Sequence, residues 1–206
     1  MRSNPPQRLL NCLLFACGLG ACLITSQGAS RWSGLRRTEI GEAVEQVAPA
    51  DVYVVGATTV GQYSAYDAAE TSRRVNGMGT GLIFDARGYI LTNAHVVEGV
   101  ERIQVTLHSG RILTANRVAE NVEDDLAVIK VDAGEKLTTI RVGTSRDLML
   151  GEPVIAMGNP YGYEQTITRG VISALHRDVQ ITDTQVYKDL IQTDASINPG
   201  NTGGPL

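Results

Sequence analysis

The sequence predicts an all-β fold, a sandwich or a barrel, and two observations lead to this prediction. Short segments rich in Val, Ile, Thr and Tyr recur along most of the chain. Turn-forming runs separate them, among them Ser109-Gly110 and Asn198-Pro199-Gly200. Many short strands at close spacing are typical of a sandwich or barrel.

Residues 1–30 have the pattern of an export signal. An apolar run over 9–24 follows two arginines and ends in small and polar residues. The run is too short for a comfortable membrane span. We expect cleavage after Ser30. The alternatives are an uncleaved membrane anchor and lipid attachment at Cys22, which ends a lipobox-like sequence.

Composition excludes several kinds of site from residues 31–206. The chain is 43% hydrophobic and 19% charged, a balance typical of a soluble globular protein with a sizeable core. All three cysteines, Cys12, Cys17 and Cys22, lie in the leader, so the remainder has no disulfide, no thiolate nucleophile and no cysteine metal site. The chain has 18 basic and 22 acidic residues, which argues against a nucleic acid partner.

One helix is expected to precede the strands. Apolar residues recur at helical spacing from Ile40 to Val47, with Thr38 placed as the N-cap and Pro49 as a stop. Nine strands then follow, at 52–55, 81–84, 89–92, 103–107, 111–118, 126–131, 153–157, 166–175 and 190–193.

Three further segments are assigned to no catalytic or binding site. Residues 61–77 are polar and poor in β-branched apolar residues, so we expect a mobile loop. Residues 136–152 are expected to bridge two halves of the domain. The glycine run 77–81 has the form G-x-G-x-G but leads into a strand and not into a helix, which argues against a dinucleotide site.

The three histidines, His95, His108 and His176, are scattered without metal-ligand spacing, so no metal site is expected. His108 is predicted at a hairpin tip and His176 at the start of a polar loop, both on the surface. His95 follows the apolar strand 89–92, and a strand end can present a side chain to a cleft.

Two other segments complete a candidate catalytic set with His95. Asp125 enters the strand 126–131 and would supply a carboxylate, with Asp124 beside it as the alternative. Residues 194–206 form a glycine-rich turn after a strand, a geometry in which two backbone N–H groups can point inward as an oxyanion hole requires. Singly, each motif is also compatible with an ordinary structural role.

Together these segments resemble the HtrA (Deg) family of exported, trypsin-like serine proteases, over about residues 39–206. The matching phrases, in order, are Gly79-Thr80-Gly81, Thr92-Asn93-Ala94-His95-Val96-Val97, Asp125-Leu126-Ala127-Val128-Ile129-Lys130, Gly158-Asn159-Pro160, Gly170-Val171-Ile172-Ser173-Ala174-Leu175 and Ile191-Gln192-Thr193-Asp194-Ala195. The resemblance implies a protease domain over 31–206 made of two six-stranded antiparallel β-barrels with the active site between them. Barrel one is expected at about 50–135, and barrel two, truncated at the C-terminus, from about 150.

The resemblance also implies the roles of five residues. His95 would be the general base, Asp125 its orienting carboxylate and Thr202 the nucleophile. The backbone N–H groups of Gly200 and Thr202 would form the oxyanion hole, and Ile197 would line a pocket for small aliphatic side chains. No cofactor and no metal are implied.

Two features depart from the family. Thr202 stands where the family has serine, and its extra methyl group and restricted χ1 hinder in-line attack. The family continues beyond the nucleophile turn with two strands and often PDZ domains, so we expect that Leu206 is an internal residue of a longer protein.

The expected function is hydrolysis of unfolded or extended polypeptides in the periplasm or cell envelope, with a membrane tether or a trimer as further expectations from the family. The alternative is a catalytically inactive homologue that binds peptides as a chaperone or regulatory module.

Overall fold

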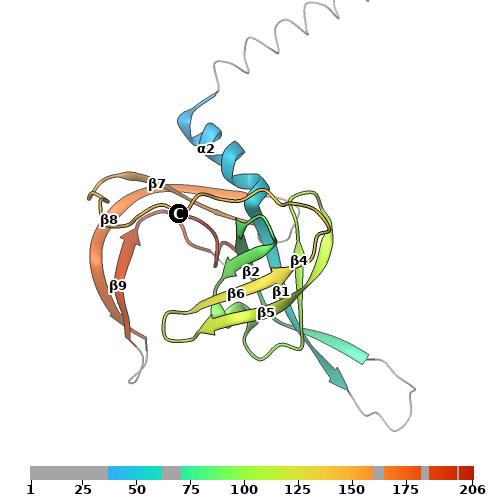
Figure 1. Cartoon of the computed structure of the whole chain (residues 1–206). Helices are drawn as coiled ribbons and strands as arrows, with labels where there is room; N and C mark the ends of the chain where they lie inside the picture. Colours follow the sequence, from blue (N-terminus) through green and yellow to red (C-terminus); the bar gives the residue numbers. More distant parts are fainter. Residues whose placement is uncertain (1–36, 62–70, 160–164, 182–185, 199) are drawn as a thin grey trace, which may run out of the picture. The chain divides into compact units, whose positions relative to one another are not determined.

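The structure, a computed structural model, describes residues 37–61, 71–159, 165–181, 186–198 and 200–206 (Figure 1). The predicted leader, with its three cysteines and the expected cleavage after Ser30, lies outside these residues. The chain divides into two units, Met1–Ala43 and Val44–Leu206, and almost all the described residues belong to the second. No helix in the described ranges is long and apolar enough to cross a membrane.

The predicted entry helix is α2 (Glu39–Val47), followed directly by a 3-10 turn, η1 (Ala48–Ala50). Thr38 caps the helix as predicted, because its Oγ1 accepts a hydrogen bond from Gly41 N at 3.2 Å. Pro49 lies in the 3-10 turn, where its missing N–H and ring end the α-helical hydrogen bonding.

Six antiparallel strands form a closed barrel in the order β1-β2-β3-β6-β5-β4, and pairing of β1 with β4 closes it (Figure 1). Pairing with β4 covers Tyr53–Ala57 of β1, and beyond Ala57 the strand continues as a hairpin with β2 as far as Gly61. The strands are β1 (Asp51–Gly61), β2 (Thr71–Asp85), β3 (Tyr89–Thr92), β4 (Arg102–Thr106), β5 (Ile112–Asn121) and β6 (Leu126–Val131). The all-β prediction is confirmed.

Alternating apolar side chains fill the barrel. Along β6, Ala127, Ile129 and Val131 are buried and their neighbours are not, the two-residue period of a strand with one face inward. Ile90 on β3 pairs with Ile129, and both are fully buried. Burial of such a side chain contributes about 1.5–3 kcal/mol, so the barrel interior is the main source of stability around the site.

Three more strands, β7 (Pro153–Gly158), β8 (Thr166–Gln180) and β9 (Val186–Thr193), form an antiparallel sheet in that order. This second sheet lies in the part of the chain where the family resemblance implies a second barrel. The intervening residues 132–152 form no helix or strand. They are attached to the first barrel, where Ile140 N donates to Ile83 O at 2.8 Å.

Two loop predictions are wrong. Residues 71–77 belong to β2, which pairs with β1 as far as Gly61 opposite Thr71, and residues 62–70 lie outside the described ranges. His176 lies within β8 and not in a loop. Both errors have one cause, because an antiparallel ladder is held by main-chain hydrogen bonds and can extend through a polar sequence that has no apolar alternation.

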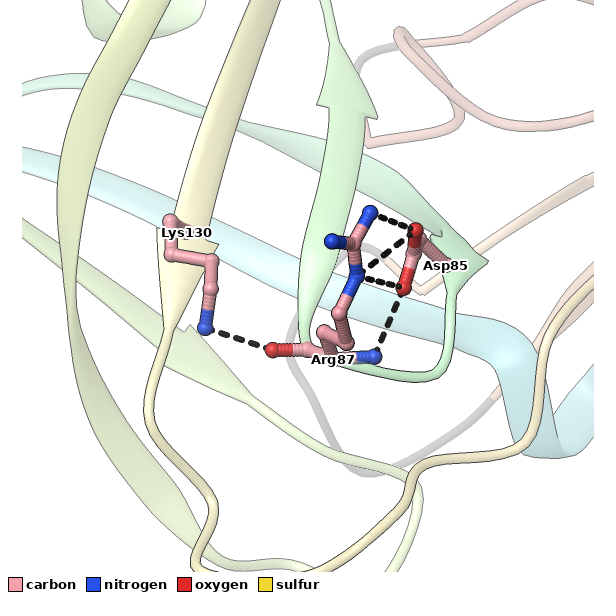
Figure 2. Close-up of polar contacts among 3 residues, drawn as sticks. All are labelled: Asp85, Arg87 and Lys130. Atoms are coloured by element: carbon pink, nitrogen blue, oxygen red, sulfur yellow. Dashed lines mark hydrogen bonds and ion pairs between the residues drawn. The ribbon is translucent and has the colours of Figure 1, made fainter.

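The turn between β2 and β3 is fixed by an ion pair (Figure 2). Arg87 donates to Asp85 from its main-chain N at 2.8 Å, from Nε at 3.0 Å and from Nη2 at 2.6 Å. The hydrogen bonds from Arg87 lower the pKa of Asp85 to about 2. Lys130 on β6 donates to the Arg87 carbonyl. These contacts hold the start of β3, the strand that leads to His95.

Candidate active site

His95 lies in α3 (Ala94–Val97), a single helical turn that directly follows β3. Three of its four residues, Ala94, Val96 and Val97, are buried in the barrel core. These apolar side chains hold the turn against the barrel core, so the imidazole is directed outward. The His95 side chain is 55% exposed.

Asp125 is brought to His95 by the register of two strands. It immediately precedes β6, and β6 pairs with β3 so that Ala127 lies opposite Thr92. The backbone of Asp125 has a φ of 52°, an uncommon value for a residue with a side chain. Two donors hold its carbonyl in this conformation, Asn93 Nδ2 at 2.8 Å and Ala94 N at 3.2 Å.

The carboxylate of Asp125 accepts three hydrogen bonds. His95 N donates to Oδ1 at 3.0 Å, and Oδ2 lies 2.7 Å from His95 Nδ1 and 3.0 Å from Asn93 Nδ2. A carboxylate opposite Nδ1 favours the tautomer with the proton on that nitrogen, because the carboxylate only accepts. The lone pair of Nε2 is then free to take a proton from a nucleophile.

Asp124, the alternative carboxylate, has a different partner. Its Oδ2 accepts a hydrogen bond from Asn121 Nδ2 at 2.6 Å. The structure therefore pairs His95 with Asp125, and Asp124 belongs to the turn between β5 and β6.

The glycine-rich turn is held by the side chain of Asn201. Asn201 Oδ1 accepts from Asn198 N at 3.0 Å, and its Nδ2 donates to Ser196 O at 3.2 Å. Gly200 and Gly203 have φ values of 111° and 83°, which residues with a side chain rarely adopt. The backbone around Thr202 is thus held by the side-chain hydrogen bonds of Asn201 and by the two glycines with positive φ.

This turn lies directly on the first barrel and on β7. Thr80 N on β2 donates to Thr202 O at 2.7 Å, and Met157 N on β7 donates to Pro205 O at 3.1 Å. A Cβ atom at Gly79 would lie 2.8 Å from Thr202 O, and one at Gly203 would lie 2.2 Å from Thr80 O. Glycine is required at both positions because two backbones are in contact.

The predicted site residues are therefore distributed over two connected parts. His95 and Asp125 are in hydrogen-bond contact, and Gly200 and Thr202 share the turn that contacts β2. Ile197, on the same segment, is 60% exposed. Within the described residues, no hydrogen bond joins Thr202 Oγ1 to the His95 ring.

The other two histidines lie away from this set. His108 is exposed in the turn after β4, as predicted, and His176 Nδ1 contacts Asp189 Oδ1 at 2.5 Å on the exposed β8–β9 ladder. Across the described ranges, no group of three His, Cys, Asp or Glu side chains is arranged to hold a metal ion.

Sequence reasoning missed three residues that hold the site, Asn93, Thr80 and Asn201. Asn93 lies two residues before His95, Asn201 directly precedes Thr202, and Thr80 lies in the glycine run 77–81. The signal for Asn93 and Asn201 was their residue type, since an amide near a catalytic candidate can hydrogen bond to the main chain, whereas no local signal marked Thr80.

Comparison with known proteins supports the same assignment. A trypsin-like peptidase domain family matches residues 79–206. A probable periplasmic serine endoprotease, DegP-like, of Halomonas elongata is 47% identical over 66% of this chain and 28% of that protein. The serine endoprotease DegS of Salmonella typhimurium is 42% identical over 80% of this chain and 44% of that protein.

A plant protein, Protease Do-like 1, chloroplastic, of Arabidopsis thaliana is 46% identical over 63% of this chain and 30% of that protein. The chain thus spans less than half of the length of each of these three relatives. The family match, the closed barrel and the order of the motifs agree, and the chain belongs to the trypsin-like peptidase family, in its HtrA (Deg) group.

Proposed function

We propose that the chain carries the catalytic part of an exported endopeptidase that hydrolyses peptide bonds of unfolded or extended polypeptides. The observation that carries the proposal is the contact of His95 Nδ1 with Asp125 Oδ2 at 2.7 Å, on a carboxylate that two further N–H groups hold in place. This arrangement prepares an imidazole to act as a general base.

In the proposed mechanism, Thr202 Oγ1 attacks the scissile carbonyl carbon while His95 Nε2 takes the hydroxyl proton. Asp125 stabilises the resulting imidazolium, which then protonates the leaving amine as the C–N bond breaks. The backbone N–H groups of Gly200 and Thr202 hold the oxyanion. Water, activated by the same imidazole, then hydrolyses the acyl-enzyme ester and restores the threonine.

Threonine is expected to make this chemistry slow. Its β-branching restricts χ1, and the methyl group occupies space beside the imidazole or the incoming carbonyl. A misplacement of the attacking oxygen by ~1 Å costs ~10²-fold in rate. Ile197, exposed near the turn, is proposed to line a pocket for side chains such as Val or Ala.

Export of the protein is part of the proposal. It is supported by the leader pattern of residues 1–30 and by relatives whose names describe periplasmic proteases. A mature N-terminus at Arg31, found by mass spectrometry of the periplasmic fraction, is the expected result. An intact Met1 retained in the membrane supports the anchor instead, and a diacylglyceryl adduct on Cys22 supports a lipoprotein.

The remaining family-based expectations stay predictions. They are a protease domain over 31–206 with a second barrel from about 150, a homotrimer, a membrane tether, and the absence of a cofactor or nucleic acid partner.

The proposed activity is tested by steady-state kinetics of the full-length protein on an unfolded polypeptide rich in Val and Ala. Thr202→Ser should raise kcat by at least ~10²-fold with a smaller change in KM, because the gain lies in the transition state. His95→Ala in that background should abolish the gain. A serine variant that binds the polypeptide but does not cleave it contradicts the proposal and supports a peptide-binding module.

A further inference from the structure

Thr80 lies on β2 with its side chain fully buried, and it makes four hydrogen bonds in and around the proposed site. Its hydroxyl donates to Gly200 O at 2.7 Å and accepts from Asn159 N at 3.0 Å. Its main-chain N donates to Thr202 O at 2.7 Å. Its carbonyl accepts from Thr92 Oγ1, also at 2.7 Å.

The direction of the hydroxyl bond is determined by its partners. A threonine hydroxyl has one proton, and Asn159 N–H can only donate, so the proton of Thr80 is directed to the Gly200 carbonyl. Gly200 and Asn159 are both buried. Without the hydroxyl, a buried carbonyl and a buried N–H would each lose a partner, which is unfavourable.

The two bonds from Thr80 hold the peptide groups on both sides of one oxyanion donor. Gly200 O belongs to the peptide between residues 200 and 201, and Thr202 O to the peptide between 202 and 203. The peptide between them carries the Thr202 N–H, one of the two proposed oxyanion donors. Fixing both neighbours restricts the direction of this N–H, and oxyanion stabilisation depends on such prior orientation.

We propose that the hydroxyl of Thr80 is a positioning group for the oxyanion turn, acting on the rate of acyl transfer through Gly200 without contacting substrate. This inference rests on the proposed function of Thr202 and its turn. It differs from a purely structural role, which would lower the stability of the whole domain and leave the turnover of the folded protein unchanged.

Three variants of the full-length Thr202→Ser protein separate these roles. Thr80→Val keeps the shape and removes the hydroxyl, and Thr80→Ser keeps the hydroxyl. Ile129→Val is the control, because Ile129 is fully buried on β6 and removal of one methylene destabilises the barrel without touching the turn.

Steady-state kinetics on the unfolded polypeptide give the first test. Thr80→Val is expected to lower kcat by about 10- to 100-fold with KM within about twofold, since the loss is in the transition state. Thr80→Ser should retain kcat within about threefold of the parent. Ile129→Val should lower Tm and leave kcat unchanged. A Thr80→Val variant with the kcat of the parent overturns the proposal.

Amide hydrogen exchange of the peptide covering 194–206 gives a second test that does not need activity. Thr80→Val should speed exchange in this peptide, and Thr80→Ser and Ile129→Val should not. A parent that cleaves nothing contradicts the proposed function. Unchanged exchange in Thr80→Val contradicts the positioning role, whether or not the parent is active.

Discussion

Asn93 and His95 share one carboxylate oxygen, Asp125 Oδ2, which lies 3.0 Å from Asn93 Nδ2 and 2.7 Å from His95 Nδ1. Asn93 also donates from the same Nδ2 to the Asp125 main-chain carbonyl at 2.8 Å. One amide group therefore fixes both the backbone and the side chain of the carboxylate that orients the imidazole.

Replacement of Asn93 by alanine is expected to lower kcat about tenfold in the Thr202→Ser protein, because Asp125 loses a charged hydrogen bond worth ~1.5–3 kcal/mol and its carboxylate gains freedom. Asn93→Asp should be more harmful, since it places a second carboxylate beside the first. The measurement is kcat of both variants at one temperature, well below the Tm of each. Equal activity of Asn93→Asp and the parent would be inconsistent with this arrangement.

The adjacent aspartates offer a matched pair of variants. Asp125→Asn presents an amide N–H or a weaker acceptor to His95 Nδ1, so the imidazole loses its productive tautomer and kcat should fall by ~10³- to 10⁴-fold. Asp124→Asn should leave kcat within about twofold, because Asp124 Oδ2 accepts its hydrogen bond from Asn121 and not from His95. A comparable loss in both variants would mean that the turn before β6 matters and not the individual carboxylate.

Asp51 is predicted to make the stability of the domain depend on pH. Burial raises the pKa of this carboxyl to about 7, and Gln165 Nε2 is a distant donor to it at 3.4 Å. Its Oδ1 has no partner within the described residues. Between the unfolded pKa of 3.8 and about 7 the folded protein binds a proton that the unfolded chain releases.

The contribution of Asp51 to the free energy of unfolding should therefore be fully present below about pH 4, fall by about 1.4 kcal/mol per pH unit between about pH 4 and pH 7, and level off above pH 7. Asp51→Asn should remove this slope and be more stable than the parent at pH 8. Urea unfolding of the domain at several pH values measures it, with Asp147→Asn, an exposed position, as the control. Parallel pH dependences for parent and Asp51→Asn would show that Asp51 is not the group responsible.

The parts of the fold that sequence predicted best are those where burial alternates. The predicted strands 89–92 and 126–131 agree with β3 and β6 at both ends, because each has one apolar face and a turn at its boundaries. The extension of β2 over residues 71–77, which pairs with the end of β1, could not be predicted in this way. Its pairing depends on main-chain hydrogen bonds, which leave no mark on the hydropathy pattern.

In the site, too, local motifs could be predicted from the sequence, and contacts between distant segments could not. His95 and Asp125 could be identified from their motifs, but the choice of Asp125 over Asp124 depended on the register of β3 with β6 and on a positive φ at Asp125. Thr80 could not be recognised as a contact of Gly200, because 120 residues separate them and no local pattern encodes the contact.

The proposed role of Thr202 as the nucleophile of a His95-dependent acyl transfer can be measured by reaction of the full-length protein with a fluorophosphonate probe, followed by mass spectrometric mapping of the modified residue. We expect a phosphonyl adduct on residue 202, forming slowly in the wild type and at least ~10²-fold faster in Thr202→Ser, and none when His95 is replaced by alanine. An adduct at another residue, or no adduct in the serine variant, would contradict it.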